Sequence, residues 1–163
     1  PHRGGARGQN GKPAQTTGKI ERCTLVSLFE TLLQEQAKLQ TIPKVTLCLG
    51  SNEEPQRHID AAKDLLRHTL SGIRFSSSLW TKPVGGKQTD RLYLNCVAEG
   101  HTNMDYPTLH NKLKDIEHAL GSTPSERQQG VVRIDIDILL LGCQRHHVDD
   151  WGRDYVKSLL AEL

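Results

Sequence analysis

The chain has 163 residues, a net formal charge of +2 and 25% charged residues, which suits one domain with a single core. No stretch approaches the roughly 20 apolar residues of a membrane helix, and this argues against a membrane protein. Residues 1–20 hold all the excess basic charge. The remainder has 17 basic against 19 acidic residues, which excludes the positive surface typical of nucleic-acid-binding proteins.

The N-terminal segment divides into two parts. Residues 1–22 are rich in Gly, Gln and Arg, cannot fill a core, and are predicted to be a flexible tail or a remnant of cloning or targeting. Residues 23–41 have apolar residues at spacings of three and four, which predicts a helix that Pro43 ends. Its apolar positions are Leu25, Leu28, Phe29, Leu32, Leu33 and Leu39. We expect this helix to pack on the main domain or on a partner.

The main domain is predicted to cover residues 44–163 and to begin with a strand over 45–49 that runs directly into a helix. Ser51 and Glu54 have the spacing of a capping box for that helix. The apolar stripe of the helix ends near Ser71. Two strands follow at 73–81 and 91–98, and alternation along the second predicts that Tyr93 and Asn95 share a face.

A second helix is predicted to open at Asp105, with Pro107 in its first turn, and to end at Gly121. A polar loop over 122–130 leads to the last strand. The order β-α-β-β-α-β predicts an α+β, ferredoxin-like sandwich with an added N-terminal helix.

That last strand carries the most informative pattern in the chain, Ile134-Asp135-Ile136-Asp137-Ile138. Alternate residues of a strand share a face, so Asp135 and Asp137 are expected side by side, with Arg133 on the same face. Carboxylate oxygens without thiolates suit Mg²⁺ that bridges to phosphate. A half-exposed strand with an acidic outer face is the alternative.

Other common sites are not indicated by the sequence. The Gly-Gly-Lys at 85–87 does not fit a phosphate-binding P-loop, because Thr81 and Gln88 occupy key positions of that motif. The four cysteines lack the spacing of a zinc or redox site and are expected to be reduced and buried, which favours a cytoplasmic or organellar-matrix setting. They are Cys23, Cys48, Cys96 and Cys143.

Several motifs together resemble one family. They are Leu49-Gly50-Ser51-Asn52, Pro83-Val84-Gly85, Tyr93-Leu94-Asn95 and the run from Arg133 to Gly142, followed by a closing segment from Arg153 to Leu163. In order and separation, residues 44–163 resemble hydroxymethyldihydropterin pyrophosphokinase. This family moves a pyrophosphoryl group from ATP to a pterin alcohol in folate biosynthesis and releases AMP.

The resemblance implies roles for individual residues. Asp135 and Asp137 would hold two Mg²⁺ ions, and Arg133 would join them as a catalytic cation. The expected pterin-binding residues are Thr81, Val84, Tyr93, Asn95 and Tyr155. The expected ATP-binding residues are Lys114, Glu117, Ile138 and Arg153. The implied partners are ATP and the pterin alcohol, with no nucleic acid or membrane, and the implied state is a monomer or weak oligomer.

The chain also departs from the family pattern. Ser122, Pro124, Gln128, Gln129 and Val132 stand where the family carries arginines and a tryptophan that clamp ATP. Arg127 and Arg133 are the available substitutes, and Arg133 is expected to have the better face. The closing segment is short where the family usually has a His-Tyr pair that contacts ATP. His146 and His147 are interpreted as a surface pair, and the alternative is that they compensate for that pair. A non-catalytic pterin- or nucleotide-binding protein of the same fold is therefore the second hypothesis.

Overall fold

The computed structural model describes residues 17–85 and 89–163. The chain divides into two compact units, residues 1–41 and residues 42–163. The helices are α1 (Thr17–Thr41), α2 (Pro55–Arg67), α3 (Tyr106–Ala119), α4 (Pro124–Gln128), η1 (Val148–Gly152) and α5 (Asp154–Leu160). The strands are β1 (Lys44–Ser51), β2 (Ser71–Phe75), β3 (Leu79–Thr81), β4 (Tyr93–His101), β5 (Asp135–Leu141) and β6 (Gln144–Arg145).

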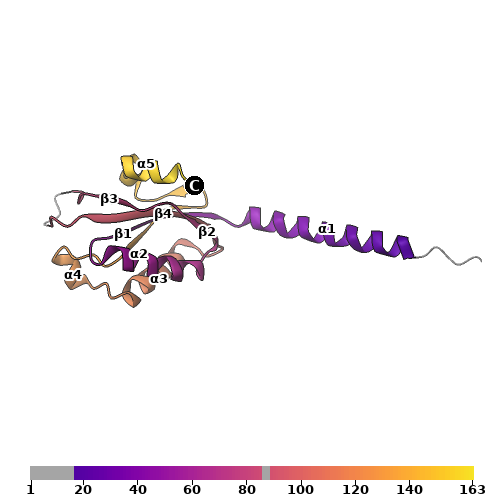
Figure 1. Ribbon diagram of the computed structural model, residues 1–163, viewed down its shortest axis with the longest axis horizontal. Coiled ribbons are helices and arrows are strands. Elements are labelled where there is room, and N and C mark those ends of the chain that lie inside the picture. The colour runs from indigo at the N-terminus through magenta and orange to yellow at the C-terminus, as the bar shows by residue number, and fades with distance from the viewer. Residues whose placement is uncertain (1–16, 86–88) are drawn as a thin grey trace, which may run out of the picture. The chain divides into compact units, whose positions relative to one another are not determined.

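In the second unit, an antiparallel sheet has the strand order β2-β4-β1-β5-β6, and β3 also pairs with β4. Helices α2 and α3 lie on one face of the sheet and α5 lies on the other (Figure 1). The predicted α+β, ferredoxin-like fold with an added N-terminal helix is confirmed.

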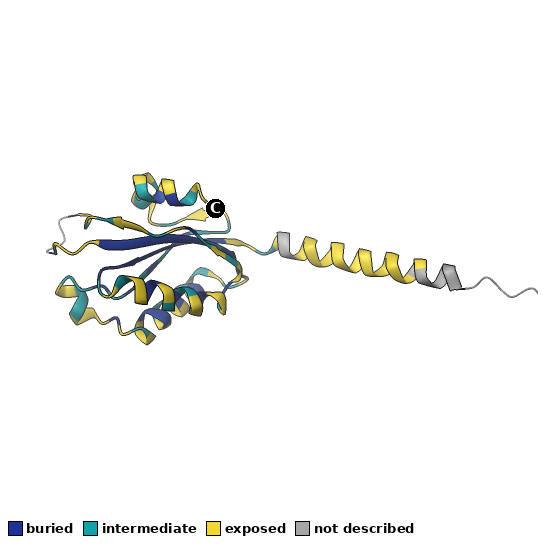
Figure 2. Cartoon of the chain, viewed as in Figure 1, coloured by how far each residue is buried: buried dark blue, intermediate teal, exposed yellow. Residues whose placement is uncertain are grey.

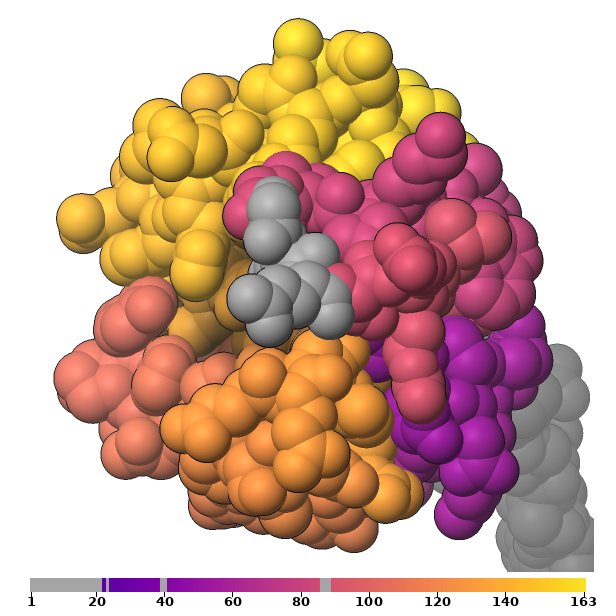
Figure 3. Space-filling view, turned by 90° about the vertical axis from the view of Figure 1, so that its left-hand side faces the viewer, coloured from indigo at the N-terminus to yellow at the C-terminus, as the bar shows by residue number. Residues whose placement is uncertain are grey.

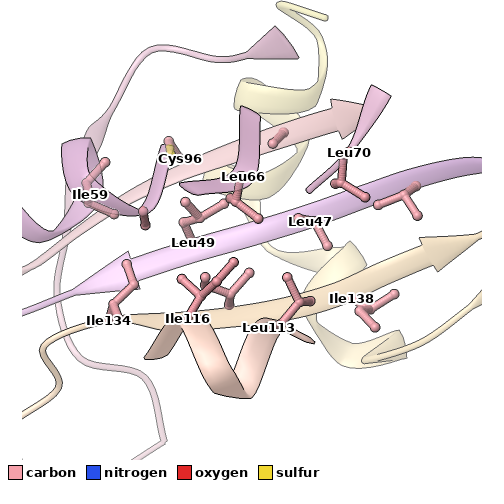
Figure 4. Close-up of a cluster of buried hydrophobic side chains, with 14 of the residues drawn as sticks. Leu47, Leu49, Ile59, Leu66, Leu70, Cys96, Leu113, Ile116, Ile134 and Ile138 are labelled. Carbon is pink, nitrogen blue, oxygen red and sulfur yellow. The ribbon is translucent and has the colours of Figure 1, made fainter. Parts of the chain in front are cut away.

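The core follows from the alternation along the strands. Leu47 and Leu49 of β1 point toward α2 and α3, and they pack with Ile134, Ile138 and apolar residues of both helices (Figure 4). A second, smaller cluster on the other face joins Val97 to α5. The central strands are therefore buried along most of their length (Figure 2). This double burial fixes which face each polar side chain of the sheet occupies.

Helix α1 is longer than predicted, since it begins at Thr17 within the segment expected to be a tail. The rest of that predicted tail, residues 1–16, lies outside the described residues. The large apolar side chains of α1 are exposed: Leu25, Val26, Leu28, Phe29, Leu32 and Leu33. In the part of the chain that the structure describes, no helix is long and apolar enough to cross a membrane.

Three local predictions were wrong. The polar loop predicted over 122–130 contains the short helix α4, which Thr123 caps by accepting a hydrogen bond from Glu126 N at 3.2 Å. The predicted strand over 73–81 is divided into β2 and β3. At Ser76 the backbone N still donates to the Val97 carbonyl at 2.9 Å, but Val97 N donates at 2.9 Å to the Ser76 hydroxyl. The predicted capping box is also absent. The Ser51 hydroxyl donates to the Glu53 carbonyl at 3.2 Å, and Glu54, with φ of 42°, precedes a helix whose first residue is Pro55.

The predicted cap at Asp105 is observed, because its carboxylate accepts a hydrogen bond from Thr108 N at 3.0 Å. Cys48 and Cys96 are free and buried, as expected, and burial raises the pKa of the Cys96 thiol to about 11. Cys143 is free but exposed, which corrects the expectation that it is buried. The side chain of Cys23 lies outside the described residues.

Candidate active site

The acid pair lies at the start of β5, with both carboxylates on one side of the sheet. Asp135 and Asp137 each have a side chain that is about 30% exposed, and both line the same cavity. The intervening Ile136 is 2% exposed and packs in the core on the opposite face. The alternation in the sequence therefore places the two acids as expected.

The cavity has a volume of about 240 Å³ and is here called the acidic cavity. It is lined by Cys48, Gly50, Thr81, Lys82, Val84, Tyr93, Asn95, Asp135, Asp137, Asp150, Arg153 and Tyr155. They come from β1, β4 and β5, from β3 and the residues that follow it, and from the C-terminal segment. Figure 3 shows the segment around β3 (magenta) and the C-terminal segment (yellow) side by side on one face of the domain. All five residues predicted to bind the pterin line this cavity together with the acid pair.

Gly50 makes room at the floor of the cavity. It lies in β1 between Asn95 of β4 and Asp135 of β5, which are its partners on the two sides. A Cβ at this position would stand 2.9 Å from Asn95 Oδ1. Asn95 is in turn held in place, because its amide donates to Thr81 Oγ1 at 2.7 Å. Glycine at position 50 therefore leaves room for the Asn95 amide, which lines the same cavity as the acids.

Glu117 on α3 supports the acid pair from behind. It is 1% exposed, and its carboxylate accepts from Ile136 N at 3.1 Å and pairs with Lys114 at 2.7 Å. Burial raises the pKa of Glu117, and the charge of Asp135 adds to the increase. Burial also acts on Asp135, but hydrogen bonding to Glu117 and the charge of Arg127 outweigh it and lower its pKa. Of these two acids, Glu117 therefore takes up a proton more readily, and Asp135 stays ionised.

The loop cation beside the acids is Arg127, not Arg133. The Arg127 guanidinium lies 3.2 Å from Asp135 Oδ1 and 3.1 Å from Glu117 Oε1. Arg133 instead makes two hydrogen bonds of 2.8 Å to the carboxylate of Glu126. The expectation that Arg133 shares the face of the acids is wrong, because β5 begins only at Asp135 and the alternation does not extend back to residue 133.

The C-terminal segment brings to the acids His147, which was interpreted as one of a surface pair, and Asp150, which the sequence did not indicate. His147 Nε2 lies 3.7 Å from Asp137, and His147 Nδ1 lies 3.9 Å from Asp150. Ligand atoms of these three residues lie within 4.8 Å of one another, so they could contribute to holding a cation. Burial raises the pKa of Asp137, and the charge of Asp135 raises it further. Arg153, predicted for ATP, pairs with Asp150 at 3.0 Å and lines the acidic cavity.

The other residues predicted to bind ATP are divided between two environments. Lys114 and Glu117 line a cavity of about 300 Å³, here called the Lys114 cavity, together with His118, Ser122, Thr123, Pro124 and Arg127. Ile138 is 2% exposed in the core, and among the residues that the structure describes it lines neither cavity. Its side chain is therefore not placed to contact a ligand.

The sequence that forms this domain matches one known family. A family model for 7,8-dihydro-6-hydroxymethylpterin-pyrophosphokinase (HPPK) matches residues 46–163. The chain belongs to the HPPK family. The match covers β1 through the C-terminus, and so includes every strand that lines the acidic cavity.

Curated relatives of this HPPK family member carry a folate-synthesis name. The chain is 32% identical over 135 residues to the folate synthesis bifunctional protein of Chlamydia muridarum, covering 73% of this chain and 30% of that protein. It is 28% identical over 133 residues to the folate synthesis bifunctional protein of Arabidopsis thaliana, covering 76% of this chain and 27% of that protein. The chain thus spans less than a third of the length of these relatives.

Proposed function

We propose that residues 42–163 transfer a pyrophosphoryl group from ATP to 6-hydroxymethyl-7,8-dihydropterin, with Mg²⁺ held by Asp135 and Asp137 and with release of AMP. The observation that carries this proposal is the shared cavity, in which the acid pair and all five expected pterin-binding residues meet. Membership of the HPPK family supports the reaction class. The folate-synthesis names of the relatives support the pathway.

The donor set fits Mg²⁺. Hard oxygen ligands from two carboxylates suit this ion, and Cys48, the thiol in the cavity, stays protonated because burial raises its pKa. When bound, Mg²⁺ would neutralise phosphate charge and orient the phosphates for transfer. Asp135 and Asp137 would hold it, and Glu117, which accepts a hydrogen bond from Ile136 N between them, would fix the backbone that carries both acids.

The residues that line the cavity suit a pterin. Tyr93 and Tyr155 would offer ring faces to a planar heterocycle, and Asn95 and Thr81 would offer an amide and a hydroxyl to its polar edge. The pterin hydroxymethyl oxygen would attack the β-phosphorus, the bond from that phosphorus to the bridging oxygen would break, and AMP would leave with the oxygen. The hydroxyl proton would pass to water.

The proposal is tested by incubating the full chain with ATP, Mg²⁺ and the pterin alcohol and measuring AMP by chromatography. We expect one AMP for each pterin diphosphate formed. A matched substrate, 6-methyl-7,8-dihydropterin, fills the same ring site but lacks the attacking hydroxyl and should give no AMP. Absence of AMP with ATP and the pterin alcohol at saturating concentrations would refute the proposed enzymatic activity.

A non-catalytic binding protein of the same fold is the second candidate. One observation favours it: Arg127 is already engaged by Asp135 and Glu117, where the family carries several clamping arginines. Calorimetry separates the two candidates. A binding protein would take up the pterin with the same affinity whether or not Mg²⁺ and α,β-methylene-ATP are present, whereas an enzyme that assembles a ternary complex should bind it more tightly in their presence.

A further inference from the structure

Arg127 has an unusual set of partners for a loop arginine. Its Nη1 donates to Asp135 Oδ1 at 3.2 Å, and its Nη2 donates both to Glu117 Oε1 at 3.1 Å and to the Ile134 carbonyl at 3.2 Å. Its side chain keeps 35% of its surface exposed. A single guanidinium is therefore shared between a candidate metal ligand, a buried acid and the backbone that leads into β5.

These contacts place the positive charge of Arg127 beside the Asp135 carboxylate, where a bound metal ion would otherwise lie. Lys114 pairs with Glu117 at 2.7 Å, and the direct ion pair that the structure gives Asp135 among the described residues is with Arg127. Burial opposes a charge on Arg127, but the carboxylates of Asp135 and Glu117 outweigh it and raise its pKa. Without this guanidinium, Asp135 would lose the cation that its carboxylate contacts, while Glu117 would keep Lys114.

Arg127 also stands between the two cavities. It lines the Lys114 cavity, whereas its partner Asp135 lines the acidic cavity. The backbone after α4 is held firmly, because Asn52 donates to the Gly130 carbonyl at 2.8 Å and accepts from Val132 N at 2.7 Å. A change of partner by Arg127 therefore needs only rotation of its long side chain, with the backbone in place.

We propose that Arg127 is an internal counter-ion of Asp135, which yields this carboxylate to a divalent cation and then binds nucleotide phosphate from the Lys114 cavity. The inference rests on the proposed function, since it takes Asp135 as a metal ligand. A divalent ion carries twice the charge of a guanidinium and binds a carboxylate oxygen at a shorter distance, so it competes well with Arg127 for Asp135. A released guanidinium beside Lys114 has the planar fork that matches phosphate.

One substitution should then act in opposite directions on two ligands. In Arg127→Gln, Mn²⁺ alone, followed by electron paramagnetic resonance, should bind about fivefold more tightly because its competitor is gone. Mg²⁺-dependent binding of α,β-methylene-ATP, measured by calorimetry, should weaken about tenfold because a phosphate ligand is lost. Arg133→Gln is the matched control, because Arg133 lies in the same segment but pairs with Glu126, and its Mn²⁺ affinity should equal that of the parent protein.

The change of partner itself is followed by NMR of the Arg127 side-chain Nε–H, assigned by its loss in Arg127→Gln. Mg²⁺ alone should shift or broaden this signal, and addition of α,β-methylene-ATP should restore a sharp signal at a new position. A signal that Mg²⁺ leaves unmoved, or equal Mn²⁺ affinity in Arg127→Gln and parent, would overturn the inference. If the parent binds no Mn²⁺ at Asp135 and Asp137, the proposed function fails instead.

Folding of the variant is checked independently. Circular dichroism should show the same secondary structure in Arg127→Gln, with a lower Tm in the absence of metal because two acids lose their cation. Arg127→Lys keeps the charge but not the fork, so its Mn²⁺ affinity should stay near that of the parent while its nucleotide affinity falls. Parent-like nucleotide binding in Arg127→Lys would overturn the part of the inference that concerns phosphate.

Discussion

Gly50→Ala should damage the acidic cavity through one defined contact. The added methyl group would lie 2.9 Å from Asn95 Oδ1, about 0.5 Å closer than the 3.4 Å at which ordinary contacts begin. Asn95 is 6% exposed and is held by Thr81 at 2.7 Å, so it cannot move away without breaking that bond. Overpacking of this kind costs about 1–3 kcal/mol of stability. Displacement of the amide should weaken pterin binding about tenfold.

Urea unfolding measures the stability cost, and calorimetry with the pterin alcohol and Mg²⁺-α,β-methylene-ATP measures binding. Gly152→Ala is the control, because a methyl group there meets no atom within 4 Å. The double variant Gly50→Ala/Asn95→Ala should recover part of the lost stability but not the binding, since it removes the clash together with the amide. Parent-like stability and pterin affinity in Gly50→Ala would refute the proposed role of this glycine.

Three further changes test other parts of the structure. Asn52→Ala should cost about 2–4 kcal/mol in urea unfolding, because Val132 N and a carbonyl of the same loop lose their partner; an unchanged midpoint would contradict this. Ser76→Ala should cost about 1–3 kcal/mol, since Val97 N loses an acceptor, and hydrogen exchange at Val97 should rise; unaltered exchange would argue against it. Asp137→Asn should abolish tight Mn²⁺ binding yet raise the metal-free Tm at neutral pH. The raised pKa of Asp137 in the parent means that ionisation of this carboxyl destabilises the fold. The gain in Tm of the variant over the parent should therefore vanish as the pH falls through that pKa.

The arrangement of the acid pair could be predicted from the sequence because a strand has a strict period of two. Asp135 and Asp137 alternate with isoleucines that fill the core, so burial of one set fixes the position of the other. The same reasoning placed Tyr93 and Asn95 together on β4. Periodic patterns of this kind therefore predict the strands of the sheet and the residues that β4 and β5 contribute to the acidic cavity.

Contacts made by loops could not be predicted in this way. The period of the strand predicts Arg133 on the face of the acids only if it is extended two residues before β5, which begins at Asp135. The chain turns there instead, and Arg133 pairs with Glu126. The short helix α4 then projects Arg127 toward Asp135. Likewise, His147 approaches Asp137 while its own backbone is left-handed, with φ of 50°. No local sequence signal indicates this conformation.

The interruption between β2 and β3 depends on contacts that are distant in sequence. Ser76 continues the pairing with β4 through its hydroxyl, and Ser77 is then held by the Glu162 carboxylate through hydrogen bonds of 2.7 Å from both N and Oγ. Because Glu162 lies at the other end of the domain sequence, a window of neighbouring residues reads the segment as one continuous strand. Hydrophobic pattern alone does not contain this information.

A crystal of the full chain soaked with Mn²⁺ and α,β-methylene-ATP would test the central claim most directly. Anomalous density should lie between the carboxylates of Asp135 and Asp137, in contact with the phosphates of the nucleotide, on the side of the sheet that faces Tyr93 and Asn95. Nucleotide bound without any metal density at the acid pair, or metal density only at a distant site, would contradict the account.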